Sequence, residues 1–382
     1  MKPKSDPCRS ARSEAASENT PGSEDGRSRT TRHRILQIDH LTVSFPGPGL
    51  RRVRAVDGLS LGIDHGRTHA LVGESGCGKS VTAMSVLRLL PVPPARYEGG
   101  RILYREGGRE LDLLRVGAPD LRAVRGGRIA MIFQEPTTCL NPVYTIGQQI
   151  VESIRLHRGL RGSSARRLAE QTLEEVGIRD PARGLDAYPH EFSGGMRQRV
   201  MIAMALVCEP SVLLADEPTT ALDVTIQAQI LDLIASLKAS RGIGVLLISH
   251  DLGVVAGSAD VVSVMYAGRI VERASVQDLF SNPLHPYTRG LLACVPRLDS
   301  TQDRLRTVRQ ITNDPLQFQN IPGLGSDLRA WWPEQNPTGD GNEGGTWVAQ
   351  QESDVIDVRV GPGHWIAAMP VGSVAASTGS TP

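Results

Sequence analysis

One eight-residue stretch, GESGCGKS, combines glycines with a lysine and a serine in the order G-x-x-x-x-G-K-S. It follows a short apolar run, THALV, and it precedes KSVTAMSVLRLL, where apolar residues recur at helical intervals. Glycines let backbone N–H groups turn inward around phosphate oxygens, and the start of a helix adds its positive dipole end. The stretch therefore predicts a site for a nucleoside triphosphate. The predicted binding residues are Gly73, Glu74, Ser75, Gly76, Cys77, Gly78, Lys79 and Ser80.

Two side chains of this loop have the chemistry to act on the nucleotide directly. Lys79 is expected to reach the β- and γ-phosphates, and the Ser80 hydroxyl is expected to coordinate Mg²⁺. Cys77 is expected to contribute its backbone alone, because the pattern leaves its position free. The alternative is a chance match in a chain with 40 glycines. The strand–loop–helix context favours binding.

A second run, SVLLADE, ends in the two acids Asp216 and Glu217. A strand that ends in an acid can lie beside the first strand and bring Asp216 to the Mg²⁺ shell. Glu217, one residue further, is then placed to polarise an attacking water. A solvated strand end is the alternative for any such pair. The phosphate-binding loop upstream favours the catalytic interpretation.

Two further polar residues follow apolar runs. Gln134 follows RIAMIF, and its amide could reach Mg²⁺ or the water. His250 follows GVLLIS, and its ring nitrogens could bond the γ-phosphate and Glu217. Taken alone, each residue is more often structural than catalytic.

The elements that would position these residues form an α/β pattern. Near-continuous apolar runs such as SVLLAD and GVLLIS are typical of parallel strands covered on both faces. Two alternating segments after residue 34 predict an antiparallel pair of strands, and ADVVSVMYAGRIVERA predicts a hairpin that turns at Ala-Gly. Residues 145–180 carry charges at helical intervals and predict a helical insertion.

The ends of the chain differ from this core. Residues 1–33 are rich in Ser, Arg and Glu, and we expect a disordered leader. We place a boundary near residue 300, and from about Gln310 the character changes to Gly, Pro, Asn, Trp and Gln with weak periodicity. Residues 301–382 are expected to form a C-terminal extension that is diverged or partly disordered. In it, Trp331 and Trp332 could form a binding patch, although buried anchors are the favoured interpretation.

Composition limits the possible partners. Forty-two lysines and arginines almost balance 41 acids, so no overall charge indicates nucleic acid. The five cysteines are scattered singly, which fits a reducing compartment better than a disulfide framework. The longest apolar stretches fall below the roughly 18 residues that a membrane-spanning helix needs.

The order of these motifs resembles that of the ATP-binding cassette ATPases. Between about Leu36 and Pro296, the loop, Gln134, SGGMRQR, the Asp-Glu pair, TALD and His250 follow in the order of that family. The resemblance implies a RecA-like P-loop NTPase core with an antiparallel β subdomain. It also implies an α-helical subdomain over about residues 135–205, within a nucleotide-binding domain of residues 34–300.

The same resemblance assigns residues to a dimer interface. It implies that Ser193, Gly194 and Gly195 contact the γ-phosphate bound by a second subunit, and that Asp223 couples the two sites. It also implies that Phe45 stacks on adenine, for which an ordinary core phenylalanine is the alternative.

Longer stretches, including MIFQEPTTCLNPVYTIGQQI and HPYTRGLLACVP, resemble the subunits that power bacterial oligopeptide and dipeptide importers. The resemblance implies ATP hydrolysis coupled to two integral permease subunits, a second cassette ATPase (a paralogue or the same chain), and an extracytoplasmic solute-binding protein. It places the chain peripherally on the cytoplasmic face of the inner membrane. ATP and Mg²⁺ are the expected ligands. Relatives that carry nickel or glutathione supply the alternative solutes.

One departure concerns cysteine. Peptide-importer subunits usually carry a cysteine cluster after HPYT, whereas this chain has none beyond Cys294, so no iron–sulfur cluster is expected. Two other classes of function stay open. A soluble cassette ATPase working on ribosomes or DNA would usually carry two cassettes or a long coiled coil, and a P-loop kinase would not need SGGMRQR.

Overall fold

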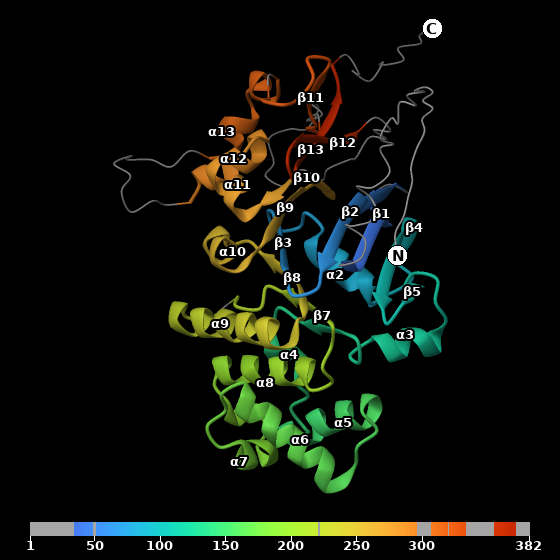
Figure 1. Ribbon diagram of the computed structural model, residues 1–382, viewed down its shortest axis with the longest axis vertical. Coiled ribbons are helices and arrows are strands. Elements are labelled where there is room, and N and C mark those ends of the chain that lie inside the picture. The colour runs from blue at the N-terminus through green and yellow to red at the C-terminus, as the bar shows by residue number, and fades with distance from the viewer. Residues whose placement is uncertain are drawn as a thin grey trace, which may run out of the picture. The chain divides into compact units, whose positions relative to one another are not determined.

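The structure is a computed structural model (Figure 1). It describes residues 34–48, 51–220, 222–295, 307–319, 321–333 and 355–371. The predicted leader, residues 1–33, lies outside the described residues.

A four-stranded antiparallel sheet begins the fold, in the order β2-β1-β4-β5. The sequence alternation puts apolar side chains of β1 in the core, and Val43 of β1 lies opposite Val56 of β2. The predicted antiparallel pair is therefore confirmed. The strands are β1 (Arg34–Pro46), β2 (Arg52–Asp64), β4 (Arg96–Glu106) and β5 (Arg109–Asp112).

A second sheet carries the parallel strands in the order β9-β3-β8-β7-β6. Every residue of β3, β6, β7 and β8 is buried, as their largely apolar sequences predict. These strands are β3 (Thr68–Val72), β6 (Ile129–Ile132), β7 (Val212–Asp216), β8 (Gly244–Ser249) and β9 (Val261–Tyr266). Because they run in parallel, β3, β7 and β8 bring their carboxyl ends to one edge of the sheet.

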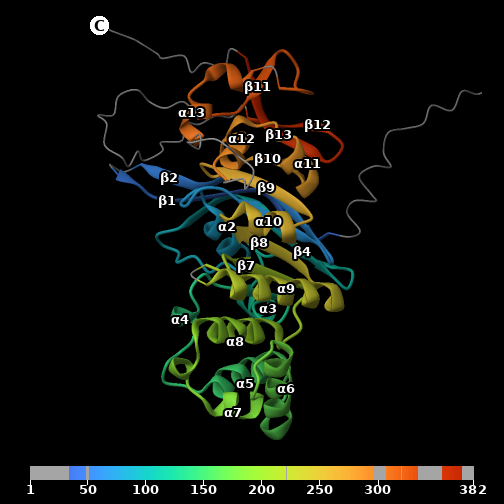
Figure 2. The same ribbon diagram turned by 90° about the vertical axis from the view of Figure 1, so that its left-hand side faces the viewer.

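A group of helices follows β6, and Figures 1 and 2 show α5, α6 and α7 on the side of α8 away from α9. Thr145 and Gln148 form a capping box at the start of α5. One buried cluster includes Ile150 of α5, Ile202 of α8 and Leu213 of β7, so these helices share a core with the sheet. The group comprises α4 (Pro136–Cys139), α5 (Ile146–His157), α6 (Gly162–Glu175), α7 (Pro181–Asp186), η2 (Pro189–Glu191) and α8 (Gly194–Leu206).

The remaining helices connect strands of the second sheet or lie near the carboxyl end of the chain. The longest is α9, which Asp223 caps at its start and Gly242, in a left-handed conformation, ends. The others are α2 (Lys79–Val86), α3 (Ala118–Val124), α9 (Val224–Arg241), α10 (Leu252–Ser258), α11 (Val276–Ser281), α12 (Pro286–Ala293), α13 (Val308–Thr312) and η3 (Pro315–Phe318).

The second sheet continues past the boundary predicted near residue 300. The predicted hairpin is confirmed: β9 and β10 (Arg269–Ser275) join at Ala267 and Gly268, both with positive φ. Strand β10 then pairs with β13 (His364–Pro370), and β13 pairs with β11 (Leu328–Ala330) and β12 (Ile356–Gly361). These strands are short and depend on the edge of β10, which explains their weak signal in the sequence. The boundary itself stays a prediction.

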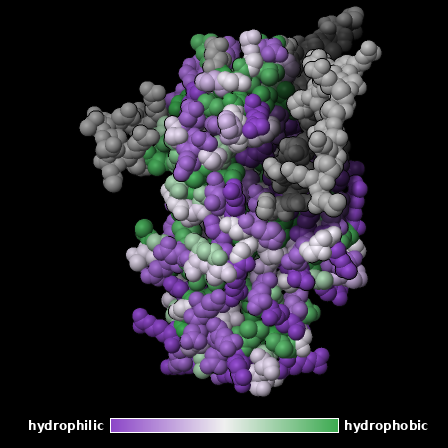
Figure 3. Space-filling model, viewed as in Figure 1, coloured by the Kyte–Doolittle hydropathy of each residue, from purple (hydrophilic) through white to green (hydrophobic). Residues whose placement is uncertain are grey.

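Trp331 is buried in the cluster that these strands share with β9, and Trp332 packs against it, as the buried-anchor interpretation predicts. Figure 3 shows hydrophobic and hydrophilic side chains mixed over the described surface, with a hydrophobic group near the helices at the bottom of the view. Within the described ranges, no helix is both long enough and apolar enough to cross a membrane.

Candidate nucleotide-binding site

The loop from Gly73 to Gly78 connects β3 to α2. Two of its glycines are required by geometry. Gly78, at the N-cap of α2, has φ of 109°, and a Cβ there would lie 2.1 Å from the carbonyl oxygen of Ala55. A Cβ on Gly73 would lie 2.1 Å from the carbonyl oxygen of Met265. The loop is therefore packed closely against β2 and β9 along its backbone.

Lys79, the first residue of α2, is almost fully buried. Its Nζ atom donates to the carbonyl oxygens of Gly73, at 2.9 Å, and Glu74, at 2.8 Å. The ammonium group is thus held inside the loop that the sequence assigns to phosphate. Carbonyl partners satisfy its N–H groups there without neutralising its charge, so an anion would be attracted to this position.

Ser80 and Asp216 lie together, as predicted. The Ser80 hydroxyl donates to Oδ1 of Asp216 at 3.1 Å, which joins the start of α2 to the end of β7. Burial raises the pKa of Asp216, and the hydrogen bond from Ser80 opposes this rise. A buried carboxylate beside a hydroxyl offers the oxygen ligands that Mg²⁺ prefers. These two residues therefore fit the predicted metal position.

Glu217 holds the centre of a hydrogen-bonded group. Its Oε2 atom accepts from Nε2 of Gln134 and from Oγ1 of Thr220, both at 2.9 Å. Its Oε1 atom lies 3.2 Å from Nδ1 of His250. The structure therefore brings together the three residues predicted to be catalytic, from the ends of β6, β7 and β8. In this arrangement the Gln134 amide faces Glu217, and its role at the metal stays a prediction.

The backbone of Glu217 is also unusual. Its φ is 48°, in the left-handed region, and its N–H donates to the carbonyl oxygen of Ile248 at 3.0 Å. This conformation turns the chain directly after β7, and non-glycine residues rarely adopt it without a local constraint. Thr220 was not singled out by sequence reasoning as a site residue. Its place three residues after Glu217 within TALD was the available signal.

The loop predicted to reach a second subunit lies at the start of α8. Oγ of Ser193 caps this helix by accepting from the Met196 N–H at 3.4 Å, and Ser193 and Gly194 are exposed. A Cβ on Gly195 would lie 2.8 Å from Cγ2 of Ile226 in α9, so the glycine allows α8 and α9 to approach. Ser193 and Gly194 are therefore accessible to a partner.

Asp223 caps α9 by accepting from the Ile226 N–H at 3.0 Å, and it is exposed. Its predicted coupling role is untested. Phe45 lies near the end of β1, half-buried against the cluster that includes Cys77. This packing agrees with a core phenylalanine as well as with a ring that presents one face to adenine, so adenine stacking stays a prediction.

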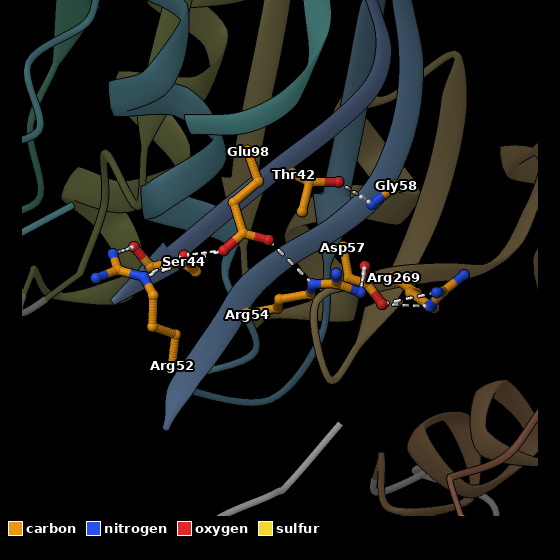
Figure 4. Close-up of polar contacts among 8 residues, drawn as sticks. All are labelled: Thr42, Ser44, Arg52, Arg54, Asp57, Gly58, Glu98 and Arg269. Carbon is orange, nitrogen blue, oxygen red and sulfur yellow. Dashed lines mark hydrogen bonds and ion pairs between the residues drawn. The ribbon is translucent and has the colours of Figure 1, made fainter. Parts of the chain in front are cut away.

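An ionic network that sequence reasoning missed joins the antiparallel sheet to β10 (Figure 4). Arg269 donates to Oδ2 of Asp57 from Nε at 2.9 Å and from Nη2 at 2.6 Å. Arg54 links Asp57, at 3.2 Å, to Glu98, at 3.3 Å. The backbone continues this link to the nucleotide loop, because Asp57 N–H donates to Gly268 and Gly268 N–H donates to Cys77.

These features define a cassette-type P-loop nucleotide-binding protein. They are a parallel sheet, a glycine-rich loop over a buried lysine, an acidic strand end beside that loop, and a helical group packed on the sheet. The chain matches the ABC transporter family over residues 56–220 and the C-terminal region of oligopeptide/dipeptide transporters over residues 271–325.

Relatives identify the family further. The chain is 51% identical to the dipeptide transport ATP-binding protein DppD of Bacillus subtilis over 266 residues, which are 70% of this chain and 78% of the relative. It is 47% identical to the oligopeptide transport ATP-binding protein OppD of the same organism over 289 residues, which are 76% and 79% of the two chains. The chain therefore belongs to the dipeptide and oligopeptide ABC transporter ATP-binding proteins.

Solved structures agree on the fold. A dimeric ATP-binding cassette in a post-hydrolysis state, bound to ADP and Pi, is 24% identical with a TM-score of 0.55, covering 63% of this chain and 99% of that one. The cbiO1 protein of Clostridium perfringens, part of an ABC transporter complex, is 26% identical with the same TM-score, covering 66% and 92%. The predicted fold class, an α/β P-loop core with an antiparallel sheet and a helical group, is confirmed.

Proposed function

We propose that this chain hydrolyses ATP as a subunit of a membrane importer for dipeptides or oligopeptides. The observation that carries the catalytic part is the position of Glu217, whose carboxylate is held by Gln134, Thr220 and His250. Glu217 directly follows Asp216, the end of β7, which accepts a hydrogen bond from Ser80 of the phosphate-binding stretch. Relatives that are about half identical and named for dipeptide and oligopeptide transport support the solute class.

In the proposed mechanism, the Glu217 carboxylate accepts a hydrogen bond from the attacking water and so orients it. His250 and Gln134 fix this carboxylate in place. Lys79 leaves its carbonyl partners and pairs with the phosphate oxygens. Ser80 and Asp216 would hold Mg²⁺, which supplies positive charge beside the phosphates. Burial of Asp216 favours a partner cation, because an uncompensated carboxylate is costly to bury.

Two cassettes are needed for this mechanism. Ser193, Gly194 and Gly195 would contact the nucleotide of a second subunit, which is a paralogue or another copy of this chain. The exposure of Ser193 and Gly194 supports this, and so does the exposure of two apolar side chains, Met196 in the first turn of α8 and Val224 at the start of α9. Asp223, at the start of α9, would then lie near the same interface.

We further propose that the helical group contacts two integral permease subunits at the cytoplasmic face of the membrane. Phe133 lies directly before Gln134, and Val143 and Tyr144 lie just before α5, and all three expose large apolar side chains. Exposed apolar side chains of this kind are suited to contact a partner protein. A solute-binding protein outside the membrane would deliver the peptide. No iron–sulfur cluster is proposed.

The ATPase part is tested with Glu217→Gln. The rate of ATP hydrolysis should fall by about 10²- to 10⁴-fold, while the Kd for ATP stays unchanged, because the amide keeps the shape but is a poor base. Glu209→Gln is the matched control. Glu209 has a positive φ too, of 52°, and pairs with Arg158 at 2.8 Å, but it precedes the other end of β7. Equal rates in the two variants would contradict the role of Glu217.

The transport part is tested by purifying tagged Glu217→Gln from detergent-solubilised native membranes with ATP and identifying the chains that co-purify. Two multispanning permeases and a second cassette are expected. Recovery of ribosomal or DNA-processing proteins without a permease would refute the importer and leave the ATP site intact.

A further inference from the structure

The phosphate-binding loop receives a hydrogen bond from far along the chain. The backbone N–H of Glu74 donates to the hydroxyl oxygen of Tyr287 at 3.1 Å. Tyr287 lies in the first turn of α12, and its side chain is fully buried. It belongs to the HPYT sequence, which resembles the importer subunits but predicts no chemistry of its own.

The peptide groups around Glu74 are held from two sides. On the other side, the Glu74 carbonyl oxygen accepts from Nζ of Lys79 at 2.8 Å. Lys79 is the residue expected to move to the phosphates when a nucleotide binds, and this partner of Glu74 is then lost. The Tyr287 hydroxyl is neutral, since burial raises its pKa, and it does not compete for phosphate. It can hold the loop in both states.

Tyr287 is itself fixed by groups on several elements. The His285 side chain caps α12, with Nδ1 accepting from the Tyr287 N–H at 3.2 Å and Nε2 donating to the Trp331 carbonyl oxygen at 3.0 Å. The Tyr287 ring packs against Tyr266, with ring centroids 4.6 Å apart, and Trp332 stacks on Tyr266 at 4.3 Å. The ring therefore has little freedom to swing away from the loop.

Glu272 of β10 completes this support. It is fully buried, and its carboxylate accepts from the N–H groups of Leu284, at 2.8 Å, and His285, at 3.1 Å. It also pairs with Nε2 of His364, in β13, at 2.7 Å. The start of α12 is thus tied to the strand that extends the sheet beyond residue 300.

We infer that Tyr287 is a positioning residue for the phosphate-binding loop. Through it, the C-terminal elements, which are α12 and the strands β11 to β13 that extend the sheet, set the affinity of the site for ATP. The inference rests on the proposed nucleotide site but not on the solute or the membrane partners. This role of the C-terminal elements in the nucleotide site requires neither an iron–sulfur cluster nor a binding patch at Trp331 and Trp332.

The test is Tyr287→Phe in the full chain, since phenylalanine keeps the ring packing and removes the acceptor. The Kd for ATP should rise about two- to tenfold, the range expected for loss of one hydrogen bond. At saturating ATP, kcat should change less than twofold, because bound phosphates then hold the loop. Tyr104→Phe is the control. It removes another buried hydroxyl, which lies 2.7 Å from Oγ of Ser211 in a different part of the fold.

A Kd in Tyr287→Phe equal to that of Tyr104→Phe would overturn the inference, and so would a loss of kcat at unchanged Kd. A wild-type chain that binds no ATP would instead refute the proposed function.

Amide hydrogen exchange on the unsubstituted chain gives an independent measure if Tyr287→Phe folds poorly. The Glu74 amide should be protected in the nucleotide-free protein and should stay protected when ATP is added. Exchange of this amide at the rate of an unstructured peptide would overturn the inference.

Discussion

Replacing Asp57 with alanine should destabilise the protein far more than the loss of an exposed arginine–aspartate pair would. The Asp57 side chain is 9% exposed and that of Arg269 is 16% exposed. Two hydrogen bonds from Arg269 and one from Arg54 end on the Asp57 carboxylate (Figure 4). Removing it would leave the Arg269 guanidinium largely buried without this partner.

The size of the effect follows from burial. Breaking one partner of a fully buried ion pair costs about 3–5 kcal/mol. Arg54 is 31% exposed and can regain water, which lowers the expected loss for Asp57→Ala to about 2–4 kcal/mol. Asp57→Asn, which keeps one acceptor oxygen, should lose less.

The assay is urea unfolding followed by circular dichroism, with the free energy of unfolding extrapolated at constant m-value. The control is Asp186→Ala. Asp186 also receives two hydrogen bonds from one arginine, Arg166, at 2.9 and 2.7 Å, but the two side chains are 69% and 49% exposed. Its removal should leave stability unchanged within error. If the two substitutions have equal effects, burial does not decide the strength of these pairs and the reasoning is wrong.

Two other outcomes are expected. Gly78→Ala should abolish measurable ATP binding, because the new Cβ would lie 2.1 Å from the Ala55 carbonyl oxygen. The control is Gly66→Ala, at a φ of 65° with no atom within 4 Å, which should lower the free energy of unfolding by about 1 kcal/mol and leave the Kd for ATP unchanged. Normal binding by Gly78→Ala would contradict the loop geometry. Burial lowers the pKa of His285 from 6.5 to about 4. Between these two pH values the unfolded chain binds a proton at His285 and the folded chain does not, so stability should be lost as the pH falls from about 6.5 to 4. His285→Gln, which can accept from Tyr287 and donate to Trp331 without titrating, should lose less over this window, as urea unfolding at several pH values would show; parallel curves would exclude His285 as a cause.

Much of the site was predictable because its parts are local. The loop from Gly73 to Ser80 is one contiguous stretch, and its strand and helix flank it in the sequence. Uninterrupted apolar runs identified the parallel strands, and parallel strands place their carboxyl ends at one edge. This is why Gln134, Glu217 and His250 could be expected to meet although up to 116 residues separate them.

Other features could not be predicted in the same way. The extent of the second sheet depends on the pairing of β10 with β13, about 90 residues later in the chain. Apolar residues after residue 300 do not recur at a regular interval, so the sequence does not indicate these strands. The Asp57–Arg269 pair likewise joins residues 212 positions apart. Charged residues are common on surfaces, so nothing in the sequence distinguishes such a pair from solvated side chains.

The sequence by itself determined the nucleotide loop, the strands that carry the acids and the family to which the chain belongs, because these depend on local patterns of glycine, charge and apolar residues. Only the tertiary structure decided that Tyr287 holds Glu74, that Glu272 joins His285 to His364, and that Trp331 shares a cluster with Tyr287. Such contacts depend on which distant segments pack together, and burial then makes each polar group require a specific partner.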